Sequence, residues 1–258
     1  MEFLNFASGS KGNCSIISTK TVNLMIDNGI GLRNLEERSR LANFDLSKIN
    51  AILITHEHSD HVKGIAKFCK KYSVPVYCHK ESREFLDPMI SPYILESDMD
   101  MPFELGDLKI EPFRLPHDSN YNLGYKISQN DTSISIATDL GYVGEATLEK
   151  LKDSTMVMLE SNHDIDMLKE GAYPYSLKHR ILSKNGHLSN DDCAEAILQL
   201  RKMGTKRFLL AHLSQDNNTP ELAFDCVAKA LEKDAYTEGV DAYVDIANQY
   251  KSTSKFTL

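Results

Sequence analysis

Apolar residues along the chain gather in short runs between polar turns, and most of these runs are typical of β-strands. Strands are predicted at Phe3–Phe6, Ser15–Ser18, Asn23–Asp27, Ala51–Ile54, Ile134–Ala137, Met156–Leu159 and Phe208–Ala211. Helical spacing follows the fourth run, at Val62, Ile65, Ala66 and Cys69, and recurs over Asp191–Met203 and Pro220–Lys233. Ser189 and Thr219 are expected as the N-caps of the last two helices. Strands that are adjacent and strands separated by helices together predict a layered α/β fold with mixed sheets.

Composition narrows the class of protein. The chain of 258 residues contains no repeat or Pro/Gly-rich linker, so one domain over residues 1–258 is expected. No leader pattern opens it, and no apolar run approaches the ~18 residues of a membrane helix. Five cysteines without a C-x-x-C pair are typical of reduced thiols in a cytoplasm. The net charge of −8 disfavours a protein that coats nucleic acid non-specifically, although a locally basic cleft is compatible with it.

The stretch AILITHEHSDHVKG places His56, His58, Asp60 and His61 on a loop between a buried strand and a helix. Imidazole nitrogens and a carboxylate oxygen are ligands suited to Zn, Mn or Fe. No cysteine joins the cluster, which argues against a structural zinc site, and the helical H-E-x-x-H pattern is absent. A metal site on this loop is therefore favoured over a solvated polar loop.

Single candidate ligands follow other apolar strands. His117 follows the run FRLP, Asp139 follows ISIAT, and His212 follows RFLLA. Ligands at the carboxyl ends of strands are typical of α/β sites. Each alone is more typical of a structural histidine or a turn aspartate, but together with the histidine loop they favour one site.

Together, these candidate ligands match the pattern of a known family. The chain resembles the metallo-β-lactamase superfamily, whose ligands are an H-x-H-x-D-H loop, a later His, a later Asp and a final His. The closer similarity is to the YycJ/WalJ group of small metallohydrolases, through ASGSKGNCSII, LMIDNGIGLRNLEER, THEHSDHVKG, LESNHDIDML, YPYSLKHRILSKNGHLSN and AHLSQDNN. The resemblance implies a four-layer αββα sandwich with two mixed sheets.

The resemblance also implies two divalent transition-metal ions, Zn or Mn. One would be held by His56, His58 and His117, and the other by Asp60, His61 and His212, with Asp139 bridging both. Asp60 is also counted with the catalytic residues. Asp27 matches an aspartate that braces the ligand loop, although an Asp before Asn-Gly is also a common turn residue.

Two further residues are candidates for acid–base work. His187, just before the expected N-cap Ser189, resembles the extra histidine of the phosphodiesterase branch, and a helix N-terminus favours a phosphate beside it. Glu160 matches an acidic partner that would orient this histidine and raise its pKa. Solvent-facing and strand-end roles stay open for the two residues. For His163, a hydrogen bond near the site and a cap of the next turn are equally compatible, whereas His79 and His179 are expected to be structural or surface residues.

Basic residues gather before His187. Lys178, Arg180 and Lys184 follow Tyr173 and Tyr175, and such a segment could contact a nucleic-acid backbone. A charge run is more often a solvated face, so both interpretations stay open. Lys63, Lys67, Lys70 and Lys71 are expected on a helix surface.

The function expected from the resemblance is a two-metal phosphodiesterase acting on nucleic acid, with a DNA exonuclease preferred and DNA favoured over RNA. The alternatives are a phosphodiesterase for a small or cyclic nucleotide and a non-catalytic, metal-bound binding module. A β-lactamase and a glyoxalase-type thioesterase are disfavoured, since no leader is seen and the third ligand stands in L-P-H-D-S. A cytoplasmic enzyme without a membrane partner is expected, and a homodimer is left open.

Overall fold

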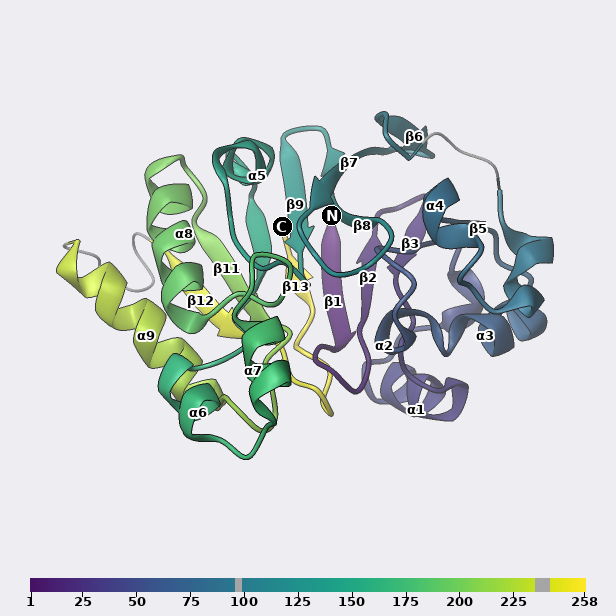
Figure 1. Cartoon of the computed structure of the whole chain (residues 1–258). Helices are drawn as coiled ribbons and strands as arrows, with labels where there is room; N and C mark the ends of the chain where they lie inside the picture. Colours follow the sequence, from purple (N-terminus) through teal and green to yellow (C-terminus); the bar gives the residue numbers. More distant parts are fainter. Residues whose placement is uncertain (96–98, 235–241) are drawn as a thin grey trace. The chain divides into compact units, whose positions relative to one another are not determined.

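The structure, a computed structural model, describes residues 1–95, 99–234 and 242–258 (Figure 1). Its strands are β1 (Glu2–Ala7), β2 (Cys14–Ser18), β3 (Asn23–Ile26), β4 (Ala51–Leu53), β5 (Val76–Tyr77), β6 (Phe103–Leu105), β7 (Leu108–Leu115), β8 (Asn122–Gln129), β9 (Thr132–Ala137), β10 (Met156–Glu160), β11 (Arg207–Ala211), β12 (Tyr243–Ile246) and β13 (Phe256–Thr257). Its α-helices are α1 (Leu32–Leu41), α2 (Ser59–Val62), α3 (Ile65–Tyr72), α4 (Lys80–Arg83), α5 (Glu145–Leu151), α6 (Ile165–Glu170), α7 (Tyr175–Ile181), α8 (Asn190–Lys202) and α9 (Pro220–Lys233). Two 3₁₀ turns, η1 (Leu46–Lys48) and η2 (Pro88–Tyr93), complete the described elements.

The strands form two mixed sheets, as the sequence predicts. One has the order β13-β1-β2-β3-β4-β5 and the other the order β12-β11-β10-β9-β8-β7-β6. In the first, β1, β2 and β3 pair antiparallel, whereas β3, β4 and β5 pair parallel. In the second, β9 to β12 are parallel and β8 runs antiparallel to β9. Parallel neighbours bring the carboxyl ends of several strands to one edge of each sheet.

The described chain divides into two compact units. Unit 1 comprises Met1–Pro112, Ser119–Leu123 and Asn248–Leu258, and unit 2 comprises Phe113–Asp118 and Gly124–Ala247. Each unit has a buried apolar cluster of its own. The expectation of one domain over residues 1–258 stays a prediction.

The core of unit 2 explains why α5, α8 and α9 cover its strands (Figure 1). Leu148 of α5, Ile197 of α8 and Val227 of α9 belong to one buried cluster with Val157 and Leu210 of the sheet. Removing such side chains from water supplies roughly 1.5–3 kcal/mol each. In unit 1, Leu35 of α1 and Phe68 of α3 are packed in the same way against strand residues.

The predicted strands and the two long helices are confirmed, with ends that differ by one or two residues. Helix α9 has the predicted bounds, and Ser189 and Thr219 are the N-caps of α8 and α9, each accepting a backbone hydrogen bond through its side chain. Strand β3 stops before Asp27, because Asp27 has a φ of 57°.

The helical spacing predicted after the histidine cluster is confirmed, but it is divided between two short helices. The segment forms two helices, α2 and α3, interrupted at Gly64. The Gly64 amide donates to the Asn28 carbonyl at 2.8 Å, so it is not available to the helix ladder. A Cβ atom at Gly64 would lie 2.1 Å from the Ile30 carbonyl oxygen, so the close approach requires glycine. The lysines at 63, 67, 70 and 71 are exposed, as predicted.

Both ends of the chain lie in unit 1. Strand β13 pairs antiparallel with β1, with Glu2 opposite Thr257, and the Leu258 amide donates to the Met1 carbonyl at 2.9 Å. The edge of β1 is therefore paired rather than open. Among the described residues, no helix has the length and apolar character that crossing a bilayer requires.

Candidate functional site

The histidine cluster lies on the loop between β4 and α2 in unit 1. The ring centroids of His56 and His58 are 4.5 Å apart, and those of His56 and His61 are 4.2 Å apart. Asp60 is in the first turn of α2, with Oδ2 3.5 Å from His61 Nε2. The cluster thus gathers three imidazoles and one carboxylate, which is the composition of a transition-metal ligand loop.

Asp27 holds this loop from the end of β3. Its Oδ1 accepts the Thr55 amide at 2.8 Å, and its Oδ2 accepts both the Thr55 hydroxyl and His61 Nδ1–H at 2.8 Å. Asp27 is buried, so each of these charge-assisted bonds is little weakened by water. Its left-handed backbone carries a cost of about 1–3 kcal/mol, which the surrounding contacts must offset.

Two backbone loops clamp the other side of the cluster. The Asn13 amide donates to the Asp60 carbonyl, and the Asn28 amide donates to the His61 carbonyl, both at 2.8 Å. A Cβ atom at Gly29 would lie 1.4 Å from the Asp60 carbonyl oxygen, so only glycine fits between the loops. The ligand loop is therefore held by main-chain contacts that tolerate little movement.

Unit 2 carries the other candidates at strand ends. His117 follows β7, Asp139 follows β9, Glu160 ends β10 and His212 follows β11. Strands β9, β10 and β11 are parallel neighbours, so their last residues come together. Asp139 and His212 both have positive φ, 62° and 56°. Asp139 Oδ1 lies 3.4 Å from His212 Nδ1 and 3.9 Å from His117 Nε2.

Glu160 is the centre of a buried hydrogen-bond group. Its Oε1 accepts from His187 Nδ1 at 2.8 Å and from His212 Nδ1 at 2.9 Å, and its Oε2 accepts the Leu140 amide at 2.8 Å. The carboxylate is fully buried. An unpaired anion there would be strongly destabilising, so these donors account for a charged Glu160.

The pKa values of this pair shift in opposite directions. Burial acts to raise the pKa of Glu160, but the charge of His187 and the two imidazole hydrogen bonds hold it well below its usual range. Burial acts to lower the pKa of His187, but the charge and hydrogen bond of Glu160 raise it above its ordinary value. These opposite shifts favour a charged carboxylate beside a protonated imidazole, and the His187 side chain remains 18% exposed.

Hydrogen bonds fix the same tautomer in several candidate ligands. Nδ1 of His61 and of His212 donates to a carboxylate, His117 Nδ1 donates to the Gly186 carbonyl at 3.0 Å, and His56 Nδ1 lies 3.1 Å from the Thr55 hydroxyl. A neutral imidazole that carries its proton on Nδ1 has its lone pair on Nε2. These donor sets therefore fit metal ligation through Nε2, with the partner of Nδ1 supporting each ring.

Burial lowers the pKa of His117, although Asp139 acts in the opposite direction. A depressed pKa keeps this imidazole neutral, which is the form that binds a metal ion. Asp139, Glu160, His187 and His212 also form a group whose ligand atoms lie within 4.8 Å of one another. Within it, the hydrogen bonds of Glu160 to both imidazoles are typical of a positioning carboxylate rather than of a metal ligand.

Buried asparagines join the loops that carry these residues. Asn162 Nδ2 donates to the His212 carbonyl at 2.8 Å, and Asn190 Nδ2 donates to Asn218 Oδ1 at 2.9 Å. Asn218 Nδ2 donates to the carbonyls of Ser161 and Asn162 at 2.9 and 3.1 Å. Three loops after β10, before α8 and after β11 are thereby locked to one another.

His163 differs from both interpretations that the sequence left open. Its ring is almost fully buried, and neither nitrogen has a hydrogen-bond partner among the described residues. Burial lowers its pKa to about 4. Asp164 supplies the N-cap of α6, accepting the Met167 amide, so His163 does not cap that turn.

The basic segment lies on and after α7. Arg180 Nε donates to Asp118, the neighbour of His117, and Lys178 Nζ donates to the Lys169 carbonyl. Lys184 is exposed after the helix, and Tyr175 is 83% exposed. The segment is therefore a basic surface with one arginine tied to the strand-end loop. His179 is exposed, as expected, and His79 caps α4 by accepting the Glu81 amide.

Some supporting residues were missed from the sequence: Asn13, Thr55, Asp118, Asn162, Asn190 and Asn218. Except for Asp118, which follows the candidate ligand His117, all stand inside the motifs that carry the family resemblance, such as SGSKGN, HLSN and SQDNN. The signal was thus present as runs of Asn and Ser, but their partners are far away in the sequence.

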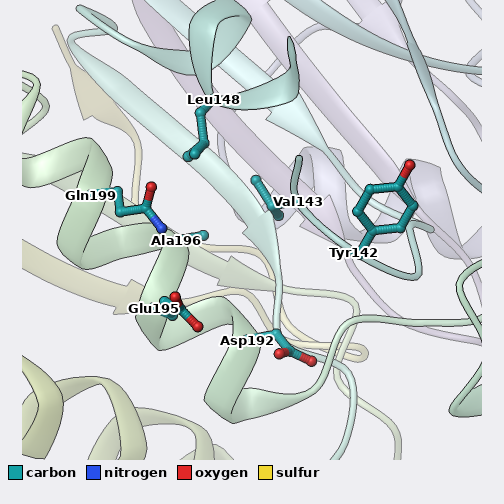
Figure 2. Close-up of a pocket in the computed structure, with 7 residues that line it drawn as sticks. All are labelled: Tyr142, Val143, Leu148, Asp192, Glu195, Ala196 and Gln199. Carbon is teal, nitrogen blue, oxygen red and sulfur yellow. The ribbon is translucent and has the colours of Figure 1, made fainter. Parts of the chain in front are cut away.

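A pocket of about 160 Å³ opens in unit 2 beside the start of α8 (Figure 2). It is lined by Tyr142, Val143, Leu148, Asp192, Glu195, Ala196 and Gln199.

Comparison with known proteins gives consistent matches. Residues 22–213 match a family model described as a β-lactamase superfamily domain. The chain is 35% identical over 245 residues to the Exodeoxyribonuclease YycJ of Bacillus anthracis, covering 93% of this chain and 92% of that protein. It is 34% identical over 243 residues to the Exodeoxyribonuclease WalJ of Streptococcus pneumoniae serotype 2, covering 91% and 90%. Among solved structures, the metallo-β-lactamase fold protein YhfI from Bacillus subtilis matches with a TM-score of 0.71 and 14% identity, over 98% of both chains.

Proposed function

Because the chain belongs to the β-lactamase superfamily, whose fold its two mixed sheets share, we propose that it is a metal-dependent phosphodiesterase that hydrolyses nucleic acid, and specifically a DNA exonuclease. The observation that carries the proposal is the His187–Glu160 pair, in which the imidazole Nδ1 lies 2.8 Å from an oxygen of a buried carboxylate. Such a pair supplies a proton donor beside the candidate ligands. The names of the two relatives, both exodeoxyribonucleases, support the substrate class.

The proposed site holds two divalent ions, Zn or Mn. His56, His58 and His117 are assigned to one ion, Asp60, His61 and His212 to the other, and Asp139 to both. In His56, His61, His117 and His212, a hydrogen-bond partner at Nδ1 leaves the lone pair on Nε2, and this supports these assignments. Imidazole and carboxylate ligands without thiolate suit Zn and Mn.

When bound, two such ions would lower the pKa of a water ligand to about 7 and would take up charge on a phosphate. Proton transfer and the positioning of the ligands are assigned to side chains of the protein. Protonated His187 donates from Nε2 to the leaving oxygen, while Glu160 holds its Nδ1 and keeps the ring in one orientation. Asp27 and Thr55 keep the ligand loop in place, and Asp60 is assigned both to ligation and to orienting the attacking water.

A small or cyclic nucleotide is the second candidate substrate, favoured by the net charge of −8, which opposes binding to long polyanions. We place either activity in the cytoplasm and in one domain over residues 1–258. The cysteines, all free in the described chain, support a reducing compartment.

The test is to load the purified protein with Zn or Mn and incubate it with end-labelled single- and double-stranded DNA, RNA and cyclic mononucleotides. The proposal expects about two ions per chain and removal of DNA ends. The Asp139→Asn variant should lose metal, whereas His179→Ala, at an exposed histidine, should not. Turnover of cyclic mononucleotides alone would favour the second candidate. A protein that binds two ions but hydrolyses nothing would be a binding module, and one that binds none would refute the site.

A further inference from the structure

The pocket beside α8 is lined mainly by two segments that adjoin residues of the candidate site. Tyr142 and Val143 lie on the loop after Asp139, and Asp192, Glu195, Ala196 and Gln199 lie along the first three turns of α8 (Figure 2). Leu148 of α5 completes the lining. None of these residues is a candidate metal ligand, so the proposed chemistry does not account for the pocket.

The lining divides into an apolar part and a polar part. Val143, Leu148 and Ala196 offer an apolar surface, and Tyr142 adds an aromatic ring that is 47% exposed. A Cβ atom at Gly144 would lie 3.2 Å from Tyr142 Cε2, so the glycine leaves room for the ring in this position. An exposed ring beside an apolar surface is suited to stacking a planar group.

The polar part carries acceptors and negative charge. Asp192, Glu195 and Gln199 are spaced three and four residues apart, so they share one face of α8. Carboxylates repel phosphate, and they accept hydrogen bonds from amino groups such as those of cytosine and adenine. The pocket therefore suits the base of a nucleotide rather than its phosphate.

The pocket is tied to the proton donor by short stretches of chain. The Leu140 amide donates to Glu160 Oε2. Tyr142 is two residues further along the chain, so its Cα atom lies within about 7 Å of that of Leu140. On the other side, His187 precedes the N-cap Ser189, whose hydroxyl donates to Asp192 Oδ2 at 2.7 Å. These short connections make the pocket a direct neighbour, along the chain, of the segments that carry Glu160 and His187.

Its size limits the occupant. A volume of about 160 Å³ is below the roughly 300–1,000 Å³ of sites that enclose whole drug-sized ligands. A single planar ring system fits this space better than a complete nucleotide. The sugar and phosphate would then lie outside, towards His187.

We propose that this pocket binds the nucleobase next to the scissile phosphate and prefers bases with an exocyclic amino group. The base stacks on Tyr142 over the apolar part, and its amino group donates to Asp192 or Glu195. The inference rests on the proposed phosphodiesterase function and adds a specificity site to it.

The test compares p-nitrophenyl 5′-esters of deoxycytidine, deoxyadenosine and thymidine monophosphates with bis(p-nitrophenyl) phosphate, which has no base. The ratio of kcat/KM on a nucleotide ester to that on the base-free ester reports the pocket. We expect the cytosine and adenine esters to exceed the thymine ester on the order of tenfold in the wild-type protein. Glu195→Gln should reduce this preference, and Tyr142→Ala should lower the ratio for every base on the order of tenfold.

Glu232→Gln on α9 and Tyr250→Ala in unit 1 are matched controls at exposed positions and should leave the ratios unchanged. Equal losses on the base-free and nucleotide esters, or no change on either, would overturn the inference. If the wild-type protein hydrolyses no ester, the proposed function fails, and binding decides the pocket separately. Methyl resonances of Val143, Leu148 and Ala196 should then still shift on adding deoxycytidine, and should not in Tyr142→Ala. Absence of that shift would refute the base pocket.

Discussion

Glu160 Oε1 accepts hydrogen bonds from two imidazoles, that of the candidate metal ligand His212 and that of the candidate acid His187. Oε1 accepts from His187 at 2.8 Å and from His212 at 2.9 Å, in a fully buried position. A single oxygen atom therefore fixes the orientation of both rings. Replacing Glu160 by Gln would keep its shape but remove the charge that raises the pKa of His187.

The His187→Ala variant tests the proton donor. It should leave metal content and folding unchanged, because His187 lies outside the proposed ligand set and is partly exposed. Turnover of DNA, whose leaving alkoxide needs a proton, should fall by ~10²–10⁴. Hydrolysis of a p-nitrophenyl phosphodiester, whose leaving group needs little protonation, should fall much less. Steady-state rates on both substrates measure the difference.

Two outcomes would speak against this role. Equal losses on both substrates would mean that His187 binds phosphate and does not donate a proton. Unchanged rates on both would remove it from the site. The exposed His179→Ala variant is the control for a general effect of losing a histidine.

At the scale of residues, the sequence identified the histidines and acidic residues of the candidate site. It did not identify the asparagine side chains that join the loops. His187 and Glu160 were paired correctly by position in motifs, and the structure has them in contact. The contacts of Asn162, Asn190 and Asn218 depend on three loops meeting in space, and no local pattern specifies which amide faces which carbonyl. The burial of the His163 ring, whose nitrogens have no hydrogen-bond partner in the described part of the chain, was equally unpredictable, since burial of a loop residue has no periodic signature.

At the scale of elements, α7 and the residues that follow it carry the charge that would contact a polynucleotide. Replacing Lys178, Arg180 and Lys184 by Gln should weaken DNA binding and flatten its salt dependence. Each lost phosphate contact reduces the slope by about 0.7 for single-stranded DNA, so the expected change is about two if all three contact phosphates. Hydrolysis of a small phosphodiester should barely change. Binding isotherms at several salt concentrations give the slope.

The control is the triple variant Lys202→Gln, Lys229→Gln and Lys233→Gln on α8 and α9, which changes net charge equally at exposed positions. A slope that falls equally in both triples would indicate a general charge effect. A slope that falls in neither would return α7 to a solvated surface and strengthen the small-nucleotide alternative.

Elements with strong periodicity were predicted well, and those defined by close packing were not. Helix α9 has the predicted bounds because Thr219, Pro220 and the apolar spacing agree. The break between α2 and α3 arises because the Gly64 amide bonds to Asn28, a partner on another loop. Short elements such as α4, α6 and β5 have too few residues for any period to be recognised.

At the scale of the whole molecule, α/β class and mixed sheets followed from the order of strands and helices. The pairing of β13 with β1 did not, because it joins residues at opposite ends of the sequence. Two-residue strands such as β13 carry almost no local signal. The division of the described chain into two units was likewise not visible in composition, since no linker separates them.

Because β13 pairs with β1, the two ends of the chain could be joined and new ends opened elsewhere without changing the fold. Because the Leu258 amide bonds to the Met1 carbonyl, a short Gly/Ser linker could join the two ends without disturbing unit 1. New ends opened between Asn130 and Asp131, in the exposed turn joining β8 and β9, would lie at the end of β9 opposite to the one that leads to Asp139. Such a circular permutant should fold, bind the same number of metal ions and retain phosphodiester hydrolysis, as measured by circular dichroism, elemental analysis and rates. A permutant that fails to fold would mean that the covalent continuity of the β8–β9 turn, rather than its packing, is what the structure requires.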